Sequence, residues 1–208
     1  MSAVHLIDHS LVTAKMSRLR DKNTSAEEFR RVLEQIAILL LSEVAKEWPL
    51  SPEEIETPLA KFSGQKLARP VVFAPILRAG LGLLEGMARV MPEAAVGHIG
   101  LYRDEQTLRP VKYYCRLPRH VADAQIVLLD PMLATGRSAC AALALLKEKG
   151  ATAIQFACVV ACQEGIAQVA SLHPEIPIFC AAIDPLLNEA GYIVPGLGDA
   201  GDRYFGTT

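Results

Sequence analysis

Short apolar runs alternate along the chain with segments of helical character, and this pattern predicts an α/β fold. The apolar runs are typical of strands in a buried sheet and span residues 71–74, 95–101, 126–129, 153–161 and 178–183. The segments with helical spacing or composition span residues 81–90, 138–149 and 163–172. Strands and helices that alternate in this order form a mostly parallel sheet with helices on its faces.

A longer amphipathic helix is predicted before the first of these strands, at about residues 25–47. Ser25 can cap its N-terminus, and Glu28, three residues later, completes a capping box. Apolar residues then recur at helical spacing, at Phe29, Val32, Leu33, Ile36, Leu40 and Val44. Residues 50–69 have a weak and polar pattern, which predicts a peripheral excursion with a short strand near Ile55.

Two further segments lack helical spacing. Residues 103–124 contain extended stretches and predict an antiparallel hairpin arm, a feature that often pairs subunits. The C-terminal segment, residues 184–208, is rich in glycine, which indicates close approach of its backbone to another group. We expect a single domain over residues 1–208, because this length suits one sizeable α/β domain with appended elements.

Composition and charge exclude several classes of protein. The net charge is −2, which argues against a broad nucleic-acid-binding surface. No apolar stretch reaches membrane length and the N-terminus lacks a signal-peptide pattern, so we expect a cytoplasmic protein that does not bind membranes. The five cysteines include no CxxC pair, which favours free buried thiols over disulfides or zinc.

The strongest candidate for chemistry is the loop after the strand at 126–129, which reads Asp-Pro-Met-Leu-Ala-Thr-Gly-Arg-Ser. It lies between a strand and a helix N-terminus, where free N–H groups and the helix dipole favour a phosphate. Thr135 and Ser138 add hydroxyl donors, and Gly136 lets the backbone turn closely around an anion. Asp130 would repel a phosphate but suits sugar hydroxyls or a metal, so the loop suggests a ribose-phosphate ligand. The alternative is an ordinary turn in which Asp-Pro only ends the strand.

This loop resembles the 5-phosphoribosyl-1-pyrophosphate (PRPP) loop of the type I phosphoribosyltransferases. Asp130-Pro131, in place of two adjacent acids, is similar to the uracil phosphoribosyltransferase branch. Pro-Ile-Leu-Arg-Ala-Gly around Arg78 and Tyr-Arg at Arg103 resemble two further strings of that family. Taken from the residues alone, Arg78 could equally be a solvated residue at a helix start.

The C-terminal segment carries the most specific part of the resemblance. From Gly191 it reads Gly-Tyr-Ile-Val-Pro-Gly-Leu-Gly-Asp-Ala-Gly-Asp-Arg-Tyr-Phe-Gly-Thr, similar to the uracil-binding hood of the same family, and we call residues 184–208 the hood. Its GxGxxG spacing does not indicate a dinucleotide site, because Pro195 precedes it and too little chain follows for a crossover helix and strand. Asp184, before a proline, is expected to cap a turn.

The resemblance implies that the chain transfers the phosphoribosyl group of PRPP to uracil, giving UMP and pyrophosphate in pyrimidine salvage. The implied PRPP contacts are Arg78, Arg103, Asp130, Pro131, Met132, Leu133, Ala134, Thr135, Gly136, Arg137, Ser138 and Asp199. The implied uracil contacts are Ile193, Gly198, Asp199 and Ala200. Asp130, Arg103 and Asp199 are the expected catalytic residues. The implied cofactor is Mg²⁺ carried by PRPP, with no direct protein ligand, and the arm implies a homodimer or higher homo-oligomer.

Two positions depart from the family pattern. Arg137 stands where bacterial members commonly have a second glycine, and it is tolerated if the position contributes only a backbone N–H. Ala190 stands where some members have histidine. Some members also respond to GTP, and nothing in this sequence marks such a site.

Two other functions remain open at this point. A pyrimidine-operon RNA-binding regulator with the same fold should have a basic face, whereas this chain is slightly acidic and lacks a Lys/Arg run. A purine or orotate phosphoribosyltransferase should have a second acid at position 131 and lack the Gly-Leu-Gly-Asp-Ala-Gly sequence of the hood.

Overall fold

The computed structural model describes residues 3–103 and 110–207, apart from the side chain of Arg103. Its main sheet runs in the order β1-β11-β10-β8-β4-β6-β7, with β5 paired to β4 and β9 paired to β10. The neighbouring strands are parallel except at the antiparallel β6–β7 edge. The strands of this sheet are β1 Val4–Leu6, β4 Val71–Leu77, β5 Ala95–Val96, β6 His98–Arg103, β7 Pro110–Arg116, β8 Gln125–Leu129, β9 Met132–Leu133, β10 Ala153–Cys162 and β11 Ile178–Asp184.

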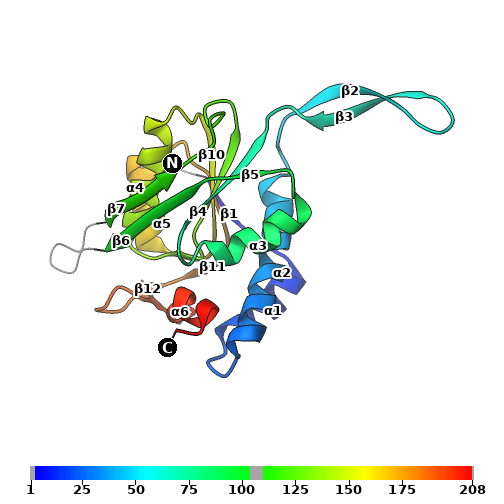
Figure 1. Ribbon diagram of the computed structural model, residues 1–208. Coiled ribbons are helices and arrows are strands. Elements are labelled where there is room, and N and C mark those ends of the chain that lie inside the picture. Colours follow the sequence, from blue (N-terminus) through cyan, green and yellow to red (C-terminus); the bar gives the residue numbers. More distant parts are fainter. Residues whose placement is uncertain (1–2, 104–109, 208) are drawn as a thin grey trace.

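Helices cover both faces of this sheet, which confirms the predicted α/β class (Figure 1). One face carries α1 Ser10–Arg20, α2 Ala26–Val44 and α3 Leu81–Val90, and the other carries α4 Arg137–Glu148 and α5 Gln163–Leu172. Alternate residues of a central strand enter the two cores: Val127 and Leu129 of β8 join the first, whereas Ile126 and Leu128 join the second. Burial on both faces explains why these strands are continuous apolar runs.

The long N-terminal helix is present as α2, but its predicted capping box is only half formed. The Ser25 hydroxyl accepts a hydrogen bond from the backbone N–H of Glu28 at 3.2 Å. The Glu28 carboxylate does not return to Ser25, because it pairs with Arg18 of α1 at 2.7 Å. Helix α1 was not predicted, although Val12, Met16 and Leu19 give it a narrow buried stripe.

A hairpin of β2 Leu50–Glu56 and β3 Lys61–Leu67 projects from the body of the molecule (Figure 1). The sequence analysis expected here only a short strand near Ile55. The strands pair along their full lengths, yet most of their side chains are exposed on both faces. A strand with no buried face has no alternation of apolar and polar residues, so its pattern was weak.

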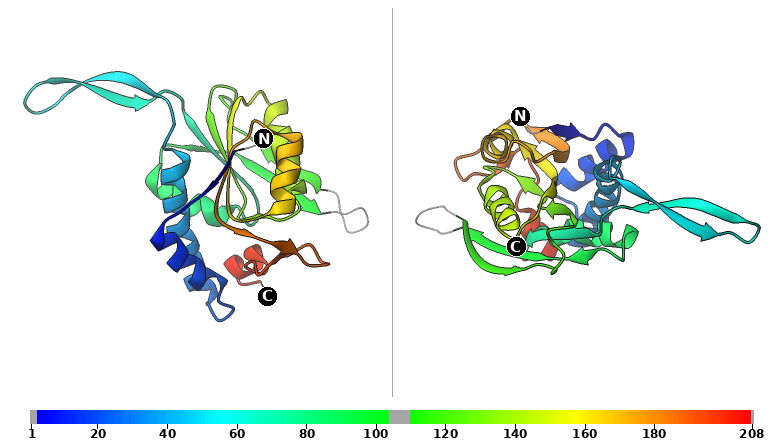
Figure 2. Two further views of the ribbon diagram at one scale, coloured as in Figure 1. Left: turned by 180° about the vertical axis from the view of Figure 1, so that it is seen from behind. Right: turned by 90° about the horizontal axis from the view of Figure 1, so that it is seen from above.

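The hairpin predicted at about 103–124 exists as β6 and β7, but it forms the edge of the main sheet. The connection between these strands, 104–109, lies outside the described residues. After β7 the chain returns to β8 through turns rather than through a longer arm. The described element that extends furthest from the body is therefore β2–β3 (Figures 1 and 2).

The hood consists of a short antiparallel pair and a short helix near the carboxyl ends of the sheet strands (Figure 1). Its elements are β12 Leu186–Leu187, β13 Ile193–Val194 and α6 Ala200–Phe205. Ile193, Leu197, Ala200 and Tyr204 are buried against the α1–α3 side of the core. In the described part of the chain, no helix combines the length and apolarity needed to cross a membrane.

Candidate active site

A cavity of about 490 Å³ lies between the loop after β8 and the hood. Both segments were predicted to bind substrate, one PRPP and the other uracil, and both line this cavity. The cavity is lined by Ala79, Asp130, Met132, Leu133, Ala134, Thr135, Gly136, Arg137, Ser138, Ala139, Ala190, Gly191, Tyr192, Ile193, Gly198, Asp199, Ala200 and Gly201. Most of the expected PRPP residues and all of the expected uracil residues are in this set.

Pro131 and Arg78, two of the expected PRPP residues, are not among the lining residues. Pro131 is buried, and its carbonyl accepts hydrogen bonds from the N–H groups of Val159 and Val160, both at 3.0 Å. Pro131 therefore anchors the loop to β10. Arg78 stands beside the lining residue Ala79. Arg103 is the last residue of β6, and its side chain is outside the described part of the structure.

Gly136 fixes the shape of the predicted phosphate loop where it enters α4. Gly136 precedes α4 with φ of 76°, and a Cβ there would lie 2.9 Å from the carbonyl oxygen of Gly165 and from Cβ of Gln168. Glycine is therefore required both by the angle and by the close packing against α5. Among the described residues no side chain caps the N-terminus of α4, and the start of this helix lines the cavity, where the N–H groups of a helix N-terminus suit an anion.

Asp130 is half-buried at the tip of β8, and desolvation raises the pKa of its carboxyl to about 7. The backbone N–H of Met132, 3.4 Å from Oδ1, opposes this shift weakly. An acid with this pKa exchanges its proton near neutral pH. In its ionised form it accepts hydrogen bonds from hydroxyl groups, as the ribose assignment requires.

The glycine-rich part of the hood bends sharply where it lines the cavity. The Val194–Pro195 peptide is cis, and Gly196 and Gly198 have φ of 58° and 70°. A Cβ on Gly198 would have open space, with the nearest atom, Cδ of Arg203, at 3.9 Å. The backbone angle rather than local crowding in the protein therefore demands glycine at position 198.

The family model described as uracil phosphoribosyltransferase matches residues 6–207. The chain belongs to the uracil phosphoribosyltransferase family. A relative named uracil phosphoribosyltransferase from Desulfitobacterium hafniense is 50% identical over 208 residues, which is 100% of both chains. A solved structure of a protein from Aquifex aeolicus is 36% identical with a TM-score of 0.94, over 99% of each chain. A purine phosphoribosyltransferase from Pyrococcus horikoshii, 16% identical, has a TM-score of 0.51 over 73% of this chain and 82% of that chain, and it shares the fold.

Within this uracil phosphoribosyltransferase fold, Arg78 links the end of β4 to the hood. Its Nη2 lies 3.4 Å from Oδ1 of Asp202, and its guanidinium lies 5.4 Å from the ring centroid of Phe205. The Leu77–Arg78 peptide is cis. The Arg78 side chain is 59% exposed, so the charge is held near the site by contacts that a stronger anionic partner could replace.

Asp199 has a structural contact as well as a place in the cavity. Its Oδ1 accepts a hydrogen bond from the N–H of Asp202 at 2.9 Å and so caps α6. Its Oδ2 accepts a hydrogen bond from the hydroxyl of Tyr192 at 3.5 Å. Tyr192 also lines the cavity, and the sequence analysis did not list it among the site residues. Tyr192 could have been predicted as a site residue, because it lies within the sequence that resembles the uracil-binding hood.

Asp184 does not simply cap a turn, as the sequence analysis expected. Its side chain is nearly buried, and Arg20 of α1 binds both carboxylate oxygens at 2.7 Å. Its Oδ2 also accepts the N–H of Gly196 at 2.8 Å. The aspartate therefore anchors the hood to an N-terminal helix. The expectation failed because the partner, Arg20, belongs to a helix that was not predicted.

Proposed function

We infer that the chain transfers the phosphoribosyl group of PRPP to uracil and releases UMP and pyrophosphate, a reaction of pyrimidine salvage. One observation carries this inference. A single cavity is lined both by a phosphate-binding loop and by the hood, in a chain that belongs to the uracil phosphoribosyltransferase family over nearly its full length. The two substrates would therefore meet in one site.

We propose that the loop at 130–138 holds the phosphoribosyl half of PRPP. The N–H groups at the start of α4, with the hydroxyls of Thr135 and Ser138, would bind the 5′-phosphate dianion. Asp130, which also lines the cavity, would accept hydrogen bonds from the ribose hydroxyls. The phosphate and the ribose would be bound by different residues because of charge. The carboxylate of Asp130 would repel the phosphate, but it would orient the ribose through its hydroxyl groups.

The leaving pyrophosphate would be stabilised by Arg78 and Arg103, whose charges matter most as the bond to ribose breaks. Mg²⁺ is proposed to arrive bound to PRPP without a direct protein ligand, and Asp130, which lines the cavity, would contact the ribose hydroxyls of that complex. The ion would neutralise charge on the departing pyrophosphate. In the described residues, no three His, Cys, Asp or Glu side chains are grouped to hold a metal by themselves.

The reaction is a substitution at the anomeric carbon of ribose, and its transition state carries positive charge on the sugar. The protein would contribute mainly by holding the two substrates in line. Asp199 is the proposed acceptor for the N1 proton of uracil. Since Oδ1 caps α6, Oδ2, the oxygen that Tyr192 contacts, would perform this role.

The uracil edge would be read by backbone groups at Ile193, Gly198 and Ala200, which line the cavity. Uracil presents an acceptor, a donor and an acceptor at O2, N3–H and O4. Fixed backbone N–H and C=O groups can match this order without a side chain. Recognition of uracil by backbone groups would also account for the many glycines of the hood, because glycine lets the backbone approach the base closely.

A base panel tests this function. Purified protein is mixed with PRPP, Mg²⁺ and one of uracil, orotate, cytosine or hypoxanthine, and pyrophosphate release is followed. Uracil alone should support rapid release, and chelation of Mg²⁺ should stop it. Rapid release with hypoxanthine or orotate, and none with uracil, would refute the assignment.

We also propose a homodimer or higher homo-oligomer in the cytoplasm, without a nucleic-acid or membrane partner. The projecting β2–β3 hairpin exposes Leu50, Ile55, Leu59 and Phe62, so it is a candidate for the subunit contact in addition to the predicted arm at 103–124, where Tyr113 and Tyr114 are exposed. Light scattering of the wild type and of Phe62→Glu tests this. The wild type should be at least dimeric and the variant smaller, whereas equal masses would exclude this contact.

A further inference from the structure

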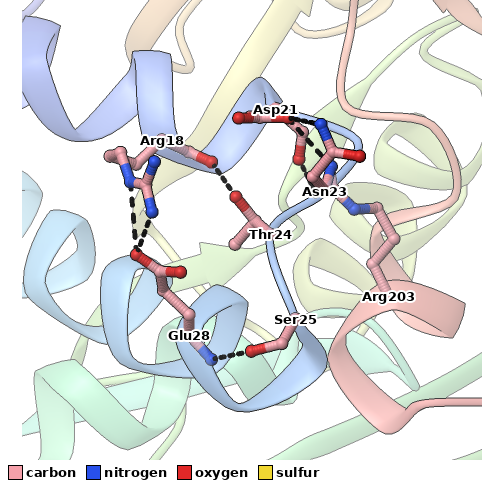
Figure 3. A network of polar contacts seen from close by, with 7 residues as sticks. All are labelled: Arg18, Asp21, Asn23, Thr24, Ser25, Glu28 and Arg203. Carbon is pink, nitrogen blue, oxygen red and sulfur yellow. Dashed lines mark hydrogen bonds and ion pairs between the residues drawn. The ribbon is translucent and has the colours of Figure 1, made fainter.

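Arg203 of α6 reaches out of the hood into the turn between α1 and α2 (Figure 3). Its Nη1 donates to the carbonyl oxygens of Leu19 at 2.7 Å and Leu197 at 2.9 Å, and its Nη2 donates to the carbonyl of Asp21 at 2.7 Å. The guanidinium also lies 4.5 Å from the ring centroid of Phe29. One side chain therefore joins the start of the chain to the glycine-rich segment of the hood.

The turn that receives Arg203 is itself held by local hydrogen bonds (Figure 3). Oδ1 of Asp21 accepts from the backbone N–H of Asn23 at 2.9 Å and from its side chain at 3.1 Å. The Thr24 hydroxyl donates to the carbonyl of Arg18 at 2.6 Å. These bonds fix the turn, so its carbonyls form a preorganised receptor for the guanidinium rather than a loose contact.

A second arginine forms hydrogen bonds with the same segment of the hood. Arg20 of α1 binds Asp184 through two hydrogen bonds and donates from Nη1 to the carbonyl of Gly196 at 2.9 Å. Asp184 in turn accepts the N–H of Gly196. Two consecutive carbonyls of the hood are thus bound by arginines from opposite ends of the chain. Arg20 binds the carbonyl of Gly196, and Arg203 binds the carbonyl of Leu197.

The hydrogen bond from Arg203 to the carbonyl of Leu197 also determines where the N–H of Gly198 points, because both groups belong to one peptide plane. The Leu197–Gly198 peptide is trans, so the carbonyl of Leu197 and the N–H of Gly198 point in opposite directions. Because Arg203 holds that carbonyl toward the α1–α2 turn, the N–H of Gly198 is directed away from the turn. Gly198 lines the cavity, where its N–H is the proposed partner of uracil.

We propose that Arg203 is a positioning residue for base recognition, which sets the orientation of the Leu197–Gly198 peptide and thereby the hydrogen-bond pattern offered to the base. Arg203 touches neither substrate in this assignment. The Arg20–Asp184 pair supports it by fixing the preceding peptide. This inference rests on the proposed uracil-binding role of the hood.

The test compares Arg203→Gln and Arg203→Lys with a matched control, Arg18→Ala. Arg18 comes from the same end of α1, but its exposed side chain pairs with Glu28 and makes no described contact with the hood. Steady-state KM and kcat are measured for uracil and PRPP, with cytosine as the competing base. Circular dichroism and thermal melts establish that each variant is folded at the assay temperature.

Arg203→Gln should raise the KM for uracil by roughly tenfold or more and leave the KM for PRPP within about twofold. The preference for uracil over cytosine in kcat/KM should fall by about tenfold, because the peptide is then free to rotate. Arg203→Lys should give values between those of the wild type and of Arg203→Gln. An ammonium group can bind one carbonyl but cannot reproduce the branched set of donors of a guanidinium. Arg18→Ala should match the wild type in all of these values.

A folded Arg203 variant with unchanged uracil KM and unchanged preference overturns the proposal, as does an equal loss for uracil and PRPP. If Arg203→Gln does not fold, Arg203→Lys, which keeps the charge, decides by the same two values. Absence of uracil turnover in the wild type would instead refute the proposed function. A structural role alone would lower the melting temperature without changing the preference between bases.

Discussion

The two halves of the cavity are built in different ways. The phosphate half is one continuous segment between β8, which is buried, and α4, which packs one face on the core. The base half lies on a hood of short elements, fixed by a few buried apolar residues and by guanidinium groups from α1 and α6. In the proposed assignment, a segment that is local in the sequence would bind the charged substrate, PRPP, and a segment fixed by long-range contacts would bind the uncharged base.

This difference suggests that the two recognition tasks are separable. A change in the loop should affect PRPP and leave the base preference intact. A change in the hood or its anchors should affect the base and leave PRPP binding intact. A variant that changes the KM for both substrates equally would count against this separation.

The largest effect is expected for the choice of base in the wild type. Cytosine carries an amino group in place of O4 and a lone pair at N3, so two fixed backbone groups would be left unpaired. A site built on hydrogen bonds rejects such a mismatch by about 10⁴ or more in kcat/KM. 5-Fluorouracil keeps the edge of uracil and should be used. Comparable turnover of cytosine and uracil would show that the hood does not read the base.

The next largest effect is expected for Gly198→Val. Valine strongly disfavours φ of 70°, so the peptide should rotate and the proposed uracil contact should be lost. We expect activity to be abolished, while calorimetry still detects PRPP binding and circular dichroism still detects the fold. Glu189→Ala, an exposed change in the same hood, is the control and should remain active. Full activity of Gly198→Val would remove the base site from this segment.

A smaller effect is expected in the phosphate half. Thr135→Ala or Ser138→Ala removes a donor to a dianion, and a hydrogen bond to a charged group contributes about 1.5–3 kcal/mol. The KM for PRPP should therefore rise roughly tenfold or more, with the KM for uracil unchanged. Thr152→Ala, at an exposed hydroxyl remote from the cavity, serves as the control. If neither loop variant changes the KM for PRPP, the loop is not the phosphate site.

The smallest effect is a pH dependence from Asp130. Since its pKa in the free protein is about 7, its carboxyl is mostly protonated at pH 6 and mostly ionised at pH 8. The ionised form accepts the ribose hydroxyls, so PRPP affinity should rise with pH, by somewhat less than about tenfold over this range. Calorimetric titrations of the wild type and Asp130→Asn separate this from the titration of PRPP itself. A wild-type profile parallel to that of the variant would exclude Asp130 as the titrating group.

The same contrast explains what the sequence could predict. The core strands and the loop at 130–138 are encoded by neighbouring residues, so apolar runs and loop chemistry were enough to predict them. The β2–β3 hairpin is exposed on both faces and left no apolar pattern. Arg20 and Arg203 were missed as anchors, because their partners lie 164 and 184 residues away in the chain. Periodicity in a local window carries no information about such pairs.

The separation along the chain between Arg203 and the turn that receives it has a consequence for the order of folding. Contacts that close a loop of 182 to 184 residues become favourable after the intervening sheet has formed, since only then are their ends held close together. The hood would therefore dock last and could undock first, in a partial opening that leaves the sheet and its two cores intact. Such an opening would expose the base end of the cavity to solvent, giving a nucleotide product a way out that does not disturb the loop holding its phosphate.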